Sequence, residues 1–136
     1  MRPLPYFPME KDAMNSARIL VDRLVATTGG ALLVLALAAF LEAGGDSFFQ
    51  EGFYRAAGSR RVLELILGAA MLASYGAVVN TPRWDFGRLL GVYVVLFFLA
   101  AQVLNRVRFG QSPSVAVWAG GALIVAGGLV MVLMQG

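Results

Sequence analysis

Two acidic residues, Glu42 and Asp46, interrupt an otherwise apolar stretch of the chain and are the residues best suited to chemistry. They are four residues apart, so a helix would present both side chains on one face, and Gln50 continues the same row. An ionised carboxylate is costly in hydrocarbon, and a like charge one turn away also favours the protonated form. We therefore predict that Glu42 alternately holds a proton and a cationic substrate, with Asp46 beside it.

The alternative interpretation is that the first membrane span ends near Leu41. Glu42 and Asp46 would then be ordinary acids at the level of the lipid headgroups, paired with Arg55 or Arg88. The two interpretations differ in one structural feature, which is whether the helix continues past Leu41.

Other chemistry is restricted by what the chain lacks, because it contains no cysteine and no histidine. This excludes disulfide bonds, zinc sites built from Cys and His, haem bound through His, and nucleophiles that are activated by His. We therefore expect no metal, no cofactor and no enzymatic activity.

The composition is that of a membrane protein. Hydrophobic residues make up 59% of the 136 residues and charged residues only 14%, against roughly 25% charged residues in a soluble domain. The net charge of +3 comes mainly from arginines that stand in ones and twos between apolar segments. This pattern fits lipid headgroups as partners and not nucleic acid, which would require a basic stripe with interleaved aromatic residues.

Four apolar runs are each about long enough to cross the bilayer, which takes about 20 helical residues. They predict an all-α, polytopic membrane protein whose four-transmembrane-helix bundle occupies residues 26–136. The spans are expected at residues 26–53, 62–79, 88–104 and 114–135. The connections between them are short, so consecutive helices should be antiparallel neighbours.

Residues 1–25 precede this bundle. Residues 1–13 hold three of the five prolines and are predicted to be extended. Residues 14–25 place apolar side chains at helical spacing, and they are predicted to form a short interfacial helix that leads into the first span.

Arginines near the membrane are almost equally divided between its two sides, with four on the side of the termini and five on the other. The positive-inside rule needs an excess of Lys and Arg to fix the orientation. This balance would permit insertion in both orientations and hence an antiparallel homodimer. Alternatively, a partner or the N-terminal segment sets a single orientation.

Further polar and small residues lie inside the spans. Tyr75 and Tyr93 would either line a cavity or pack with one hydrogen bond each. Gly120 and Gly127 are seven residues apart and share a helix face, which favours close packing of helices within the bundle or between subunits.

Four short motifs lie along residues 30–135. They are Glu42-x-x-Gly45, Gly52-Phe53, Phe109-Gly110-Gln111 and Gly120-x-x-Leu123-Ile124-x-x-Gly127. Together they resemble the small multidrug resistance family of the drug/metabolite transporter superfamily. The resemblance implies a four-span, antiparallel homodimer of a prokaryotic cytoplasmic membrane, with Glu42 as the essential glutamate and Gly120, Leu123 and Gly127 in the dimer contact.

The chain also departs from that family's pattern. Val95-Leu96-Phe97 stands where the family has a Gly-x-Gly kink, Tyr93 stands where it has a tryptophan, and Leu90 stands where it has a tyrosine. The long N-terminal segment is a further difference. A related YnfA-like branch fits these features as well.

The resulting expectation is a small proton-coupled exporter of a cationic or amphipathic molecule, acting as a homodimer. Glu42 would couple protons to the substrate, and Asp46, Tyr75 and Tyr93 would line the site. Quaternary ammonium, guanidinium-like and polyamine compounds and a lipid-linked headgroup all remain open as substrates. The alternative is a non-transporting accessory subunit of a larger membrane complex, which the missing kink and the proline-rich N-terminal segment favour.

Overall fold

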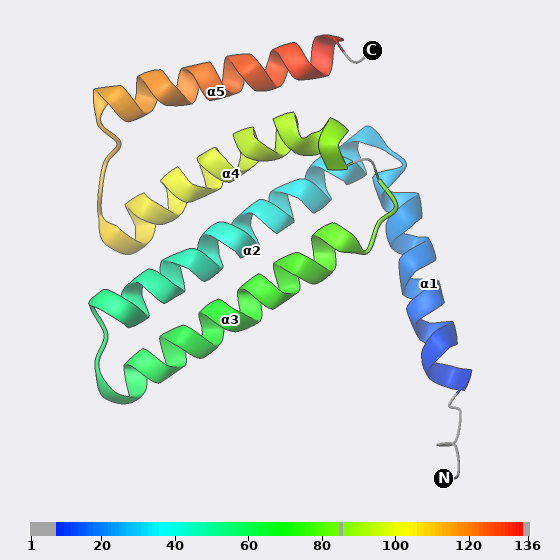
Figure 1. The fold of residues 1–136 in the computed structure, drawn as a ribbon, viewed down its shortest axis with the longest axis horizontal. Helices are drawn as coiled ribbons and strands as arrows, with labels where there is room; N and C mark the ends of the chain where they lie inside the picture. Colours follow the sequence, from blue (N-terminus) through cyan, green and yellow to red (C-terminus); the bar gives the residue numbers. More distant parts are fainter. Residues whose placement is uncertain (1–7, 85, 135–136) are drawn as a thin grey trace.

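The computed structural model describes residues 8–84 and 86–134, and this part of the chain consists of helices without a strand (Figure 1). The five helices are α1 (Pro8–Val25), α2 (Thr28–Tyr54), α3 (Gly58–Asn80), α4 (Phe86–Phe109) and α5 (Val115–Met134). The last four are each long and apolar enough to cross a membrane. At 1.5 Å per residue, even the shortest matches a hydrocarbon core of about 30 Å. The prediction of an all-α, four-span membrane protein is confirmed.

Three helix ends differ from the predicted ends by four or more residues. α1 begins at Pro8, so the prediction of an extended segment is wrong for residues 8–13, and residues 1–7 lie outside the described residues. Proline is tolerated in the first turn of a helix, where its missing N–H would have no partner. α3 begins at Gly58 and α4 ends at Phe109, so both extend farther than predicted through charged residues.

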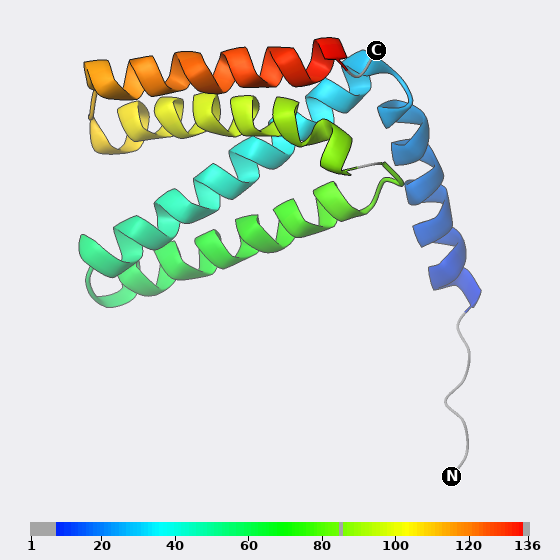
Figure 2. The same cartoon turned by 45° about the horizontal axis from the view of Figure 1, so that its top comes forward.

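α1 projects away from the four long helices and contacts α2 (Figures 1 and 2). Thr27 forms the break between the two helices: its hydroxyl donates to the Leu24 carbonyl at 3.0 Å and accepts from the Gly30 N–H at 3.1 Å. This capping satisfies a free donor at the start of α2. Apolar side chains of α1, including Ile19 and Leu20, are exposed, and the interfacial position of this helix stays a prediction.

The four long helices follow one another in the order α5, α4, α2, α3, with α2 lying between α4 and α3 (Figure 1). The backbones of α3 and α4 therefore do not pack against each other, and the prediction that consecutive helices are neighbours is wrong for this pair. α2 buries the most residues because its sides are lined with small side chains. Ala38, Ala39 and Ala43 belong to the same buried cluster as Tyr93 and Ala100 of α4. α3 and α5 bury few residues, as expected for helices that face lipid.

α2 and α3 approach closely where glycines replace side chains. A Cβ atom on Gly68 would lie 3.0 Å from the carbonyl oxygen of Gly45 and 3.0 Å from the ring of Phe49. Gly52 is similarly confined by Leu65. Glycine at these positions allows the two backbones to pack against each other, which is how helices associate in lipid. The central part of α2, including Glu42, is thereby held in place from the α3 side.

Candidate functional site

Glu42 lies near the middle of a continuous helix. α2 has 14 residues before Glu42 and 12 after it, so the helix does not end near Leu41. Both acids thus lie within the length of the helix, as the first interpretation requires, and the depth of Glu42 in the bilayer stays a prediction. At 1.5 Å per residue, Glu42 is about 18 Å along the axis from the end of α2, which exceeds half of a hydrocarbon core of about 30 Å.

The carboxyl group of Glu42 is half-buried and points toward α4. The Tyr93 hydroxyl donates a hydrogen bond to Oε2 of Glu42. Tyr93 is itself buried, with 6% of its surface exposed, and belongs to the core cluster. Because a phenol donates a single proton, Oε1 of Glu42 keeps its capacity to accept a proton or to contact a cation.

Tyr75 of α3 completes this group. Its ring stacks on the ring of Tyr93 with 6.3 Å between the centroids, and Phe97 lies beside Tyr93 at 6.4 Å. Three of the predicted site residues, Glu42, Tyr75 and Tyr93, thus come together from three different helices. We call them the tyrosine–glutamate cluster.

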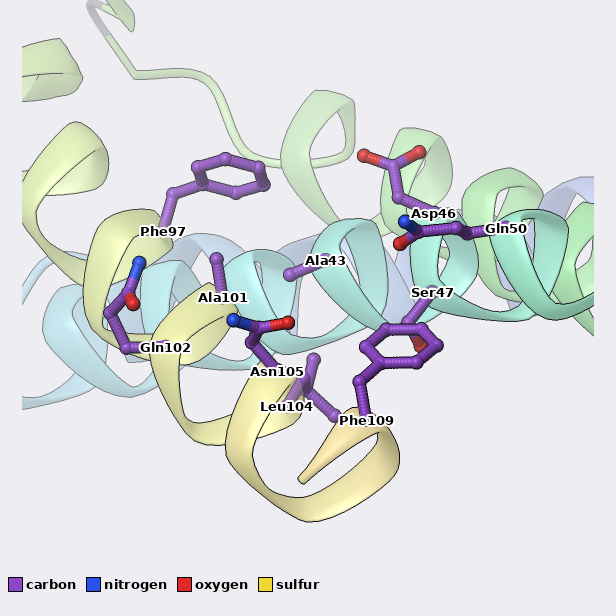
Figure 3. Close-up of a pocket in the computed structure, with 10 residues that line it drawn as sticks. All are labelled: Ala43, Asp46, Ser47, Gln50, Phe97, Ala101, Gln102, Leu104, Asn105 and Phe109. Carbon is purple, nitrogen blue, oxygen red and sulfur yellow. The ribbon is translucent and has the colours of Figure 1, made fainter. Parts of the chain in front are cut away.

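Asp46, the fourth predicted site residue, lies outside this cluster. It is exposed and lines an open pocket of about 240 Å³ between α2 and α4, with α2 side chains on one side and α4 side chains on the other (Figure 3). The pocket is lined by Ala43, Asp46, Ser47, Gln50, Phe97, Ala101, Gln102, Leu104, Asn105 and Phe109. Phe97 belongs to this lining and also touches Tyr93, so the pocket adjoins the tyrosine–glutamate cluster.

The sequence prediction missed an ionic network at the end of the bundle where α2 ends and α3 begins. Arg60 pairs with Glu51 at 3.0 Å and with Glu64 at 3.6 Å, and Arg108 pairs with Glu64 at 2.8 Å. The guanidinium of Arg108 also lies 3.8 Å from the ring centroid of Phe48. Glu51 and Glu64 are buried. The network connects α2, α3 and α4 and neutralises two carboxylates that would otherwise be costly to bury.

One signal in the sequence pointed to this network. Arg60 and Glu64 are four residues apart, which indicates a pair on one helix face. Glu51 and Arg108 stand at the ends of two other spans, and antiparallel connections bring those ends to the same side of the bundle as Arg60.

The residues predicted for the dimer contact lie away from both the cluster and the pocket. A Cβ atom on Gly120 or on Gly127 would meet no described atom within 4 Å, and Leu123 is 74% exposed. The neighbouring Gly121 and Gly128 instead face Phe98 and Val95 of α4. The prediction that Gly120 and Gly127 share a face is confirmed, and that face is the outer face of α5.

Comparison of the chain with models of protein families, with curated proteins and with solved structures finds no match. The interpretation of the site therefore depends on the chain's own geometry.

We predict that Arg108→Gln lowers the free energy of unfolding by about 2 kcal/mol, because Glu64 would remain buried with only the exposed, more distant Arg60 as its partner. The matched control is Arg106→Gln, whose exposed guanidinium bonds, among the described residues, only Ser112 and the Gly110 carbonyl. This control should stay within about 0.5 kcal/mol of the wild type. Denaturant unfolding in micelles measures both, and equal stabilities would contradict the importance of the network.

Proposed function

We propose that the protein is a small proton-coupled membrane transporter that exports a cationic or amphipathic small molecule and works as a homodimer. The observation that carries the proposal is the position of Glu42, halfway along a membrane-length helix with its carboxyl group turned toward Tyr93 of α4. Acidic side chains inside membrane helices are rare and mark ion or substrate pathways.

The tyrosine–glutamate cluster supplies what a proton-coupled exchange requires. Ionised Glu42 accepts the hydrogen bond of Tyr93 and has a second oxygen to attract a cation. Protonation removes the negative charge and with it the attraction for the cation. Proton entry at Glu42 is thereby linked to release of the cation, which is the coupling that an exporter needs.

The outer face of α5 supports the homodimer. Gly120 and Gly127 leave the backbone of α5 accessible, and Leu123 projects between them, 74% exposed. Small residues let two helices approach closely in lipid, where packing drives association. We propose that this face is where two copies of the chain meet.

The projecting helix α1 favours the second candidate function, an accessory subunit of a larger membrane complex. α1 leaves the bundle and exposes Met14, Ile19 and Leu20, which a partner protein could cover. Native mass spectrometry of the chain extracted from its own membrane separates the two candidates, since stoichiometric co-purification with other chains supports the subunit role.

The transport proposal predicts that Glu42→Gln abolishes proton-coupled flux. The amide has nearly the same shape as the carboxyl group but does not ionise, so it cannot take up and release a proton during transport. The assay uses proteoliposomes with an internal pH dye and a panel of monovalent organic cations, and flux in this variant should fall to the level of empty vesicles. Ser74→Ala, which removes an exposed hydroxyl of α3, is the control and should retain flux. Undiminished, proton-dependent flux in Glu42→Gln would end the proposal.

The dimer proposal predicts that Gly127→Leu weakens self-association about tenfold, equivalent to about 1.4 kcal/mol of lost helix packing. Gly76→Leu on α3 is the matched control, because a Cβ atom there also meets no described atom within 4 Å. Both variants should keep the monomer's fold, and only the first should shift the monomer–dimer equilibrium in detergent. An identical equilibrium in both variants would argue against this face.

A further inference from the structure

We propose that the pocket around Asp46 binds the cargo as a small, singly charged primary ammonium ion, at a place separate from the proton site at Glu42. This inference rests on the proposed function only in calling the bound ion the cargo of transport. The binding of the ion to the pocket does not depend on the proposed function. The argument starts from the groups that line the pocket in Figure 3.

The pocket offers hydrogen-bond acceptors that have no partner in the described part of the chain. The carboxylate of Asp46 forms no ion pair or hydrogen bond with any described residue, and the side-chain amides of Gln50, Gln102 and Asn105 form none either. Ser47 donates its proton to the Gly44 carbonyl at 2.7 Å, so its oxygen can only accept. The three amides can both donate and accept, whereas the carboxylate and the hydroxyl oxygen can only accept, so the lining as a whole favours a ligand with N–H donors.

The charge of this lining selects a cation, because Asp46 is its only ionisable group. An anion would face that carboxylate without a compensating positive group in the lining. A metal ion normally takes several hard ligands, and no group of three or more acidic side chains suited to a metal occurs in the described part of the chain. An ammonium group instead brings three N–H donors, which match one carboxylate and two amide oxygens.

Two further features limit the size and charge of the ligand. The pocket of about 240 Å³ lies below the roughly 300–1,000 Å³ of sites for drug-sized ligands. The lining holds a single carboxylate, that of Asp46, so a second positive charge on the ligand would have no charged partner there. The ring of Phe97 offers an apolar surface to a short alkyl chain.

The pocket adjoins the proton site closely enough for the two to influence each other. Asp46 and Glu42 are one helical turn apart, and Phe97 touches both the pocket and Tyr93. A positive charge in the pocket attracts the negative charge of ionised Glu42, and a proton on Glu42 removes that attraction. In the exchange, Glu42 would therefore bind the proton and Asp46 would bind the cargo.

The test is calorimetric titration of the full chain in detergent micelles with n-butylammonium, and with tetramethylammonium, which has no N–H donor. We expect wild type to bind n-butylammonium and to prefer it over tetramethylammonium. Asp46→Asn should weaken this binding by at least about tenfold, through loss of a charged hydrogen-bond partner. Glu42→Gln should bind n-butylammonium more tightly than Asp46→Asn does, and the control Ser74→Ala should bind it as the wild type does.

Three results would overturn the inference: no binding of n-butylammonium to the wild type, unchanged binding by Asp46→Asn, or equal binding of tetramethylammonium. Loss of binding in Glu42→Gln alone would place the cargo on the proton site, and it would leave the proposed function intact. The proteoliposome assay of Glu42→Gln judges that function independently, because it reports proton-coupled flux rather than binding. Circular dichroism of each variant verifies that the helices remain folded.

Discussion

The rest of the structure depends on one constraint, which is that a carboxyl group sits halfway along a helix that must cross hydrocarbon. A charged side chain at the centre of a membrane helix costs about 3 kcal/mol or more. The chain meets this cost by turning Glu42 toward α4, where the Tyr93 hydroxyl donates to it. The phenol can reach because alanines of α2 keep the two helices close. The hydrogen bond from Tyr93 stabilises ionised Glu42 at one oxygen. The other oxygen stays available to a proton or a cation.

α2 contacts a different kind of neighbour on each side. Its glycines pack against residues of α3, its alanines meet α4, and its polar row faces the site and the pocket. The network of Arg60 and Arg108 with two buried glutamates fixes the far end of this arrangement across three helices. Between that network and the capped start of α2, Glu42 has fixed neighbours on two sides. No described helix packs against the outer face of α5.

The four spans and the place of Glu42 within the first of them could be predicted, because long apolar runs of membrane length have one explanation. The separation of Asp46 from Glu42 could not. Four residues advance a helix by about 40° beyond a full turn, so two residues on one face can meet different neighbours. The predicted fourth helix ends at residue 104 because charged residues follow, whereas α4 continues to Phe109 and its Arg108 pairs with Glu64 of α3. Such pairings depend on where three helix ends lie relative to one another, and a short stretch of sequence does not encode that arrangement.

The central claim, that Glu42 is a protonatable carboxyl group at hydrocarbon depth, is tested most directly by chemical labelling in the membrane. Dicyclohexylcarbodiimide enters the apolar phase and reacts with protonated carboxyl groups, whereas a water-soluble carbodiimide reaches groups exposed to water. We expect peptide mass spectrometry to find Glu42 modified by the apolar reagent and protected from the water-soluble one. Rapid labelling of Glu42 by the water-soluble reagent, without labelling by the apolar one, would contradict the account.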